Sequence, residues 1–143
     1  MDQISEIRRF NRFYASILGK LDQKIYHNPY PLTEVRVLQQ IDFENGKTAS
    51  EIGDAIGVDR GYMSRIVKRF ELSGLIQKQQ LAGDKRHFAL FITEKGQAEI
   101  EKFVALANLA LSEMTQKLTD QEMRDLVEAM SVIEKLLSKE ELT

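Results

Sequence analysis

The stretch TASEIGDAIGVDRGYMSRIVKRFELSGL, residues 48–75, predicts two short helices joined by a tight turn. Thr48 and Glu51 have the Thr-x-x-Glu spacing of a capping box, in which the side chain of each residue binds the backbone amide of the other. A helix is therefore expected over residues 51–56. Gly57 ends it after two turns, because glycine adopts the left-handed conformation that closes a helix at low cost.

Asp59 is placed to cap the second helix of this stretch, and Gly74 supplies a left-handed stop at its end. Between them the apolar residues recur every three or four positions, which is the spacing of one buried helix face. These residues are Met63, Ile66, Val67 and Phe70. The two helices and the turn at residues 57–59 together predict a helix-turn-helix.

After Gly74 the apolar period changes from 3.6 residues to 2, which predicts strands over residues 75–80 and 87–92. Between the strands lie Lys85 and Arg86, so the hairpin has a basic tip. A helix-turn-helix followed by a two-stranded hairpin predicts a winged helix-turn-helix, with the hairpin as its wing.

Long amphipathic helices are predicted at both ends of the chain. Residues 4–25 form the first, which ends before the two prolines of segment 28–31, and Thr33 is placed to cap a short helix after them. Thr93 is placed to cap a long helix after the hairpin, and a second capping box at residues 119–122 opens the last helix. The expected fold class is mainly α with a small β-hairpin wing: a winged helix-turn-helix plus long N- and C-terminal helices.

Length and composition bound the function classes. The 143 residues suit a single domain, and 43% apolar and 29% charged residues are typical of globular proteins. The absence of cysteine excludes disulfides, thiolate nucleophiles and cysteine-ligated zinc, and two distant histidines, His27 and His87, make a metal site or a histidine-based triad a poor fit. The carboxylates are scattered and no phosphate-binding glycine motif occurs, so we expect neither an enzyme nor a bound cofactor.

No segment of the sequence predicts export or membrane insertion. The N-terminus lacks the basic and apolar regions of a signal peptide. The most apolar stretch, residues 103–111, is nine residues long, against about 18 needed to span a bilayer. We therefore expect a cytoplasmic protein without a membrane partner.

Charge is distributed unevenly along the chain, although 20 basic and 22 acidic residues leave a net charge of only −2. Residues 60–86 carry seven basic residues against two acidic ones, a net charge of +5. Residues 1–59 carry seven basic and nine acidic residues, and residues 87–143 carry six basic and eleven acidic residues. The positive segment coincides with the second helix of the helix-turn-helix and with the hairpin, which are the elements that a winged helix presents to DNA.

Once the apolar stripe of this second helix faces the core, its other faces carry residue types that suit a DNA groove. Arginine reaches two acceptors on a guanine edge, hydroxyls and lysine bind phosphates, and Gly61 lets the backbone approach closely. The alternative is that these basic residues form only a solvated surface. This is the usual explanation for an isolated run of basic residues. The DNA-binding candidates on this helix are Arg60, Gly61, Tyr62, Ser64, Arg65, Lys68 and Arg69.

Three residues at the hairpin tip complete the set. Arg86, next to Lys85, is positioned to enter an adjacent minor groove, although a surface arginine in a turn is commonly idle. Asp84 would repel phosphate, so it is expected to shape the turn or to hold an arginine by a salt bridge. We favour a structural role for Asp84 and count Lys85 and Arg86 among the DNA-binding candidates.

These motifs resemble the MarR family of winged-helix transcriptional regulators over essentially the whole chain. The motifs are GYMSRIVKRFELSGLI (61–76), the wing DKRHFALFIT (84–93) with its Asp-x-Arg, and ITEKG (92–96). The resemblance implies that residues 60–69 form a major-groove recognition helix, that Arg86 is the minor-groove arginine of the wing, and that Asp84 orders the wing. It also implies a homodimer built from the terminal helices.

A more specific resemblance is to the regulator half of MarR-like proteins fused to a GNAT-type acetyltransferase. It rests on IRRFNRFY (7–14), PYPLTEVRVL (29–38) and DRGYMSRIVKRFE (59–71). The 143 residues contain no acetyltransferase half, so that activity is not expected of this chain. A protein that works with a separate acetyltransferase stays open.

The expected organisation is a single MarR-like domain over residues 1–143, with a DNA-binding lobe at 32–93 and dimerisation helices at 1–30 and 94–143. Long helices with wide apolar faces have more surface to bury than a small core covers, and a second copy covers it. The alternative is that they pack on each other within one chain. A twofold dimer sets two recognition helices about 34 Å apart and predicts a palindromic operator on double-stranded DNA.

We expect a homodimeric transcriptional regulator, most simply a repressor, and the resemblance implies a small-molecule effector that releases the DNA. The candidates to line an effector pocket are Phe10, Tyr14, Tyr26 and Tyr30. Aromatic residues at helical spacing are more commonly core. The competing hypothesis is a protein-interaction module whose winged helix docks an acidic partner.

Overall fold

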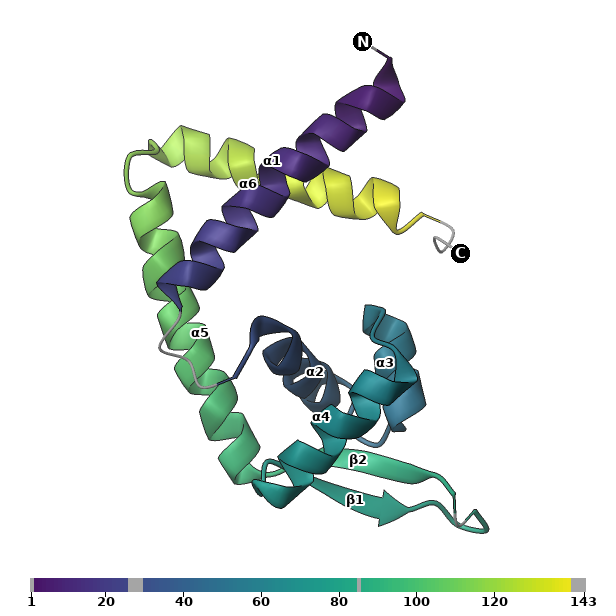
Figure 1. Cartoon of the computed structure of the whole chain (residues 1–143). Helices are drawn as coiled ribbons and strands as arrows, with labels where there is room; N and C mark the ends of the chain where they lie inside the picture. The colour runs from purple at the N-terminus through teal and green to yellow at the C-terminus, as the bar shows by residue number, and fades with distance from the viewer. Residues whose placement is uncertain (1, 26–29, 85, 140–143) are drawn as a thin grey trace. The chain divides into compact units, whose positions relative to one another are not determined.

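A computed structural model describes residues 2–25, 30–84 and 86–139, in two compact units. The first unit, Met1–Ala107, contains α1 (Gln3–Lys24), α2 (Leu32–Phe43), α3 (Ala49–Ile56), α4 (Arg60–Leu72), β1 (Ile76–Gln80), β2 (Phe88–Ile92) and the first part of α5 (Glu94–Thr115) (Figure 1). The second unit, Asn108–Thr143, contains the rest of α5 and α6 (Asp120–Leu137). The predicted fold class is confirmed: helices dominate, and β1 and β2 form a two-stranded hairpin.

The helix-turn-helix forms through the predicted caps. Thr48 Oγ1 accepts from the Glu51 amide at 3.2 Å, and Glu51 Oε1 accepts from the Thr48 amide at 3.0 Å. Since Thr48 is the N-cap, α3 begins at the next residue, two positions before the predicted start. Gly57 closes α3 with φ at 74°, and Asp59 Oδ1 then accepts from the Tyr62 amide at 2.8 Å and opens α4.

The predicted cap of α2 is wrong. The structure starts this helix at Leu32 with Pro31 as its N-cap, so Thr33 lies within the first turn. Proline has its φ already near the helical value, here −57°, and has no amide that needs a partner, while its carbonyl accepts from the Val35 amide at 3.1 Å. The helix therefore begins without any side-chain cap.

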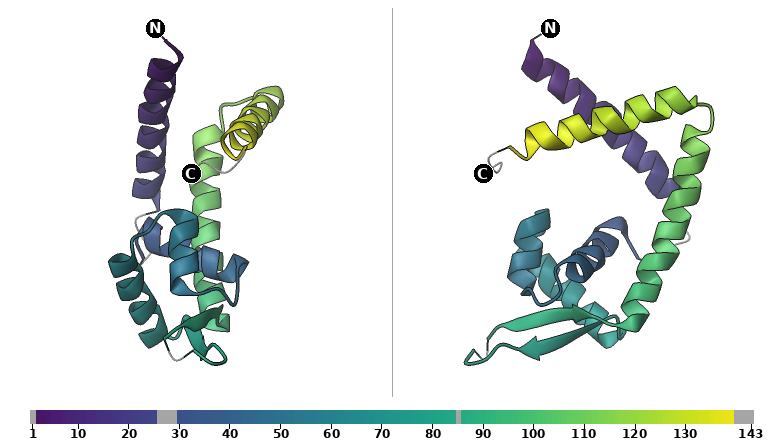
Figure 2. Two further views of the ribbon diagram at one scale, coloured as in Figure 1. Left: turned by 90° about the vertical axis from the view of Figure 1, so that its right-hand side faces the viewer. Right: turned by 180° about the vertical axis from the view of Figure 1, so that it is seen from behind.

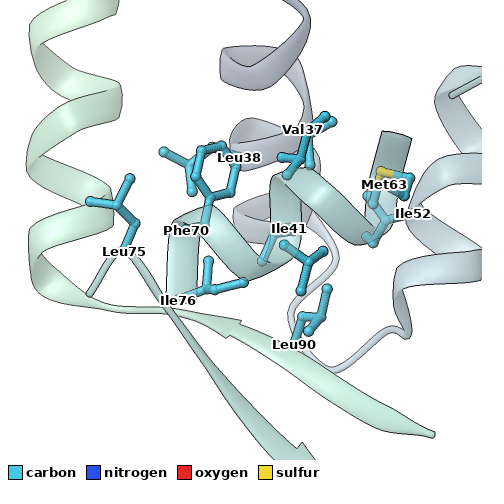
Figure 3. Packing of buried hydrophobic residues seen from close by; sticks show 11 residues of the cluster. Val37, Leu38, Ile41, Ile52, Met63, Phe70, Leu75, Ile76 and Leu90 are labelled. Atoms are coloured by element: carbon cyan, nitrogen blue, oxygen red, sulfur yellow. The ribbon is translucent and has the colours of Figure 1, made fainter. Parts of the chain in front are cut away.

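The core of the first unit lies between α2, α3, α4 and the hairpin (Figure 3). The whole apolar stripe predicted on α4 is buried. Phe70 of α4 packs among Leu38 of α2 and Leu75, while Ile52 of α3 lies beside Met63. Burying one such side chain contributes about 1.5–3 kcal/mol, and this holds α4 with its polar faces outward.

The hairpin is tied to the helix-turn-helix at its base. The right-hand view of Figure 2 shows β1 and β2 running side by side, and they are paired antiparallel with Ile76 opposite Ile92. The loop after α2 joins β2: the Gly46 amide donates to the Leu90 carbonyl at 2.8 Å, and the Leu90 amide donates to the Lys47 carbonyl at 2.9 Å. These bonds fix the direction of the wing relative to α3 and α4.

The start of α5 is fixed against the same base. Thr93 Oγ1 accepts from the Gly96 amide at 3.1 Å, which confirms the predicted cap, and donates to the Gly74 carbonyl at 2.7 Å. Gly74 itself has φ at 78°, as the predicted left-handed stop requires. One threonine therefore joins the end of α4, the hairpin and α5.

The terminal helices leave apolar surface uncovered. No residue of α1, all of which the structure describes, is buried, and Ile4 and Phe13 are 67% and 60% exposed. In the second unit α6 opens with the predicted capping box of Thr119 and Glu122, yet none of its residues, which are all described, is buried either. Its exposed apolar residues are Met123, Val127, Met130, Val132, Ile133, Leu136 and Leu137.

Candidate nucleic-acid interface

A groove of about 490 Å³ lies between α3, α4 and the hairpin. Its wall from α4 carries Arg60, Ser64 and Lys68, and its wall from the wing carries Arg86. The fold thus brings together four of the predicted DNA-binding residues from two separate segments. Thr48 and Ser50, at the N-terminus of α3, line the same groove, and a helix N-terminus favours negative charge.

Two residues of this groove were missed by the sequence reasoning. Nζ of Lys78 on β1 lies 3.6 Å from Oε1 of Glu71 on α4 and 5.4 Å from the centre of the Phe88 ring. His87 lines the groove next to Arg86. Lys78 lies in the basic segment 60–86, which could have indicated a role in DNA binding. The alternation of residues along the strand, however, does not predict that its side chain lies beside α4.

Arg65 and Tyr62 form a second part of the exposed face of α4. The guanidinium of Arg65 lies 5.6 Å from the centre of the Tyr62 ring, within the range of a cation–π contact. Tyr62 is half-buried and packs against the core cluster. A ring fixed in this way restricts the arginine and leaves its donors exposed. Gly61, which precedes Tyr62, is exposed as well.

Arg69 has a different environment from the other basic residues of α4. Its Nη2 forms an ion pair with Oε1 of Glu34 of α2, a carboxylate that is only 4% exposed. Apart from this ion pair, Glu34 Oε1 has no hydrogen-bond partner among the described residues. The geometry indicates that Arg69 neutralises a buried charge between α2 and α4, which leaves it fewer donors for DNA.

We expect Arg69→Ala to destabilise the fold by about 1–3 kcal/mol, because it leaves the Glu34 carboxylate buried without a counter-charge. The neighbouring Lys68→Ala is the matched control and should cost less than about 0.5 kcal/mol. Urea unfolding of both variants measures the difference. Adding Glu34→Gln to Arg69→Ala should recover part of the loss; equal stabilities for the two single variants would contradict this role.

At the wing, Asp84 makes the contacts that an ordering role requires. Its Oδ1 accepts from the Arg86 amide at 2.8 Å, and its Oδ2 lies 2.6 Å from Nδ1 of His87. The Arg86 amide and the His87 ring hold the pKa of Asp84 below its ordinary value. The contribution of these bonds is therefore present above the ordinary aspartate pKa and is lost only as the pH falls through the lowered one. Lys85 lies outside the described residues.

Comparisons with known proteins find a family likeness in the segment that forms most of this groove. The MarR family profile matches residues 31–88, which run from the start of α2 into the hairpin. This segment, 58 of the 143 residues, is similar to the MarR family.

One curated relative and two solved structures are similar to this chain. The HTH-type transcriptional regulator TtmR of Methylorubrum extorquens is 30% identical over 87 residues, which are 61% of this chain and 41% of TtmR. A MarR family protein from Bacillus stearothermophilus has the same fold at a TM-score of 0.81 and 20% identity, over 97% of this chain and 99% of that one. A cysteine-to-serine mutant of MarR from E. coli, complexed with operator DNA, matches with a TM-score of 0.71 and 22% identity, over 93% of this chain and 99% of that one.

The aromatic residues that the MarR resemblance suggested for an effector pocket lie in different surroundings. Phe10 and Tyr14 of α1 stack on each other with ring centres 5.8 Å apart. Tyr30 meets Phe70 edge to face at 6.0 Å and packs against the core. Tyr26 lies outside the described residues. The groove between α4 and the wing contains none of Phe10, Tyr14 and Tyr30.

Two other classes of site are absent from the residues that the structure describes. Residues 2–25, 30–84 and 86–139 contain no group of three or more histidine, aspartate and glutamate side chains that could hold a metal ion. Among the same residues, no helix combines the length and the apolar character that a bilayer span needs.

Proposed function

We propose that this chain is a transcriptional regulator that binds a palindromic operator on double-stranded DNA as a homodimer and represses transcription there. The observation that carries the proposal is the groove in which Arg60, Lys68, Lys78 and Arg86 converge from α4 and the wing. The DNA complex of the similar MarR chain from E. coli supports the same use of the fold.

In this proposal α4 enters the major groove and the wing follows the adjacent backbone. Arg65, restricted by Tyr62, reads a base edge, and Ser64 and Lys68 bind phosphates. Arg86 enters the minor groove, where the narrow walls concentrate negative potential. Gly61, exposed at the N-terminal end of α4, lets the helix backbone come close to the duplex. Arg69 is assigned mainly to the Glu34 pair.

The homodimer is proposed from the uncovered apolar surface of the terminal helices, within residues 1–30 and 94–143. Neither α1 nor α6 buries a residue, although both have apolar faces and every residue of both is described. Burying that surface against a second copy is favourable, at roughly 25 cal/mol per Å² removed from water. The dimer would present two copies of the lobe formed by residues 32–93.

We expect Val127→Lys combined with Met130→Lys to dissociate the dimer, because two charges would be buried in its apolar interface. Asp125→Lys combined with Glu128→Lys adds two lysines on another face of the same helix and should leave the dimer intact. Sedimentation velocity measures the molecular mass of each variant. A dimer that survives the first pair, or dissociates with both pairs, would overturn this assignment of the interface.

The experiment that tests the function is selection of bound duplexes from fragments of the source genome. The proposal predicts enrichment of a palindrome whose half-sites are about 10 base pairs apart, one turn of the duplex. Binding of the enriched duplex should weaken steeply with salt, since each neutralised phosphate releases about 0.9 of a counterion. Enrichment of no common sequence, with tight capture of an acidic protein instead, would favour the competing interaction module.

Release of DNA by a small ligand is a separate part of the proposal. The stacked pair Phe10 and Tyr14 offers ring faces to an aromatic compound. Screening small aromatic compounds for release of the selected duplex tests this part. A hit whose effect survives Phe10→Ala and Tyr14→Ala together would place the effector site elsewhere.

A further inference from the structure

His87 is a residue of the basic groove to which the DNA-binding assignment gives no role. It lines the groove next to Arg86, and its side chain is 54% exposed. Its Nδ1 lies 2.6 Å from Oδ2 of Asp84, whose other oxygen is taken by the Arg86 amide. The carboxylate therefore occupies one ring nitrogen, and Nε2 is the nitrogen left for a ligand in the groove.

The contact with Asp84 decides which form of His87 can bind a phosphate. A carboxylate accepts hydrogen bonds only, so it favours the ring form with a proton on Nδ1. In a neutral ring of that form Nε2 is an acceptor, and a phosphate oxygen would meet its lone pair. Only the charged imidazolium has a proton on both nitrogens, and it can then join Asp84 to a phosphate.

The charges around His87 change when DNA enters the groove. The groove brings together cations from α4 and from the wing, namely Arg60, Lys68, Lys78 and Arg86, against the acidic Asp54 and Glu71. Asp84, at 2.6 Å, is the carboxylate that contacts the ring, and the other charged groups that line the groove have a net positive charge. Phosphates that fill the groove reverse this balance.

We propose that His87 binds a backbone phosphate of the DNA through Nε2 as an imidazolium held by Asp84, so that duplex binding takes up a proton at this residue. The proposal rests on the proposed function and assigns a further contact residue to it. DNA affinity should then fall as the pH rises from about 6 to about 8.

The test compares the wild type with His87→Gln, using the duplex selected on the wild-type chain and labelled with fluorescein. We expect wild-type affinity to fall about three- to tenfold between about pH 6 and pH 8, and that of His87→Gln to stay nearly constant. At low pH, the slope of log affinity against log salt concentration should also be steeper by about one for the wild type than for His87→Gln. His27→Gln, which removes the other histidine of the sequence, is the matched control and should behave as the wild type.

Three outcomes separate the two proposals. Loss of the pH dependence in His87→Gln alone supports the phosphate contact. The same pH dependence and salt slope in His87→Gln and wild type, with both binding the duplex, overturns the contact and leaves the proposed function standing. Failure of the wild type to bind any duplex at low salt overturns both. Thermal unfolding of each variant checks that the fold is retained.

Discussion

Replacing Arg65 and Arg86 together with alanine is expected to weaken selective DNA binding strongly. Arg65 is held against the Tyr62 ring at 5.6 Å, and the backbone of Arg86 is fixed by Asp84 at 2.8 Å. Both guanidinium groups are exposed on the face formed by α4 and the wing. A well-placed arginine contributes about 1–3 kcal/mol of discrimination, so two should change affinity by at least about thirtyfold.

The matched control removes the same charge elsewhere. Arg36 of α2 lines a separate cavity with Phe43 and Ile100, and Lys102 of α5 pairs with Glu99. We expect Arg36→Ala combined with Lys102→Ala to weaken binding by less than about threefold, because distant exposed charges are screened. Fluorescence anisotropy with the selected duplex measures both. Equal losses in the two double variants would show that the chain binds by net charge alone.

Gly96→Ala should destabilise the first unit by about 1–3 kcal/mol. A Cβ at this position would collide with the carbonyl oxygen of Leu75 and approach Cγ1 of Ile92 to 2.7 Å. The carbonyl cannot move freely, because it accepts from the Thr93 amide at 3.0 Å and Leu75 is fully buried. The start of α5 would therefore be pushed away from the base of the wing.

Gly19→Ala is the opposite case in the same kind of helix. Nothing lies within 4 Å of a Cβ built on Gly19 of α1, so this substitution should stabilise the protein by about 0.5–1 kcal/mol through helix propensity alone. Urea unfolding monitored by circular dichroism compares the two. A Gly96→Ala variant as stable as Gly19→Ala would show that the close packing of α5 on Leu75 is wrong.

Local features of the fold could be predicted from sequence because their partners are three or four residues apart. The boxes at residues 48–51 and 119–122 and the Asp59 cap all formed as expected. The exception, Thr33, failed because Pro31 already begins α2 without a side-chain cap. The period of the apolar residues likewise identified the buried face of α4, since only one face of a helix can meet the core.

Contacts between distant segments could not be predicted. Glu34 and Arg69 are 35 positions apart, and nothing in either neighbourhood indicates that one is buried and the other is its counter-ion. Lys78 reached the groove because the register of the hairpin sets it opposite Leu90, next to α4. For Asp84 the turn role was anticipated, but its bond to His87 depends on the conformation of the loop.

The most direct test of the central claim is the ratio of dissociation constants for the selected duplex and a scrambled duplex of the same composition. Both constants are measured at about 0.15 M salt. Their ratio cancels the non-specific electrostatic contribution to affinity, which is the same for any duplex of this composition. Recognition by α4 and the wing predicts a preference of at least about 10³-fold for the selected sequence. A ratio near one would contradict sequence-specific binding by this chain.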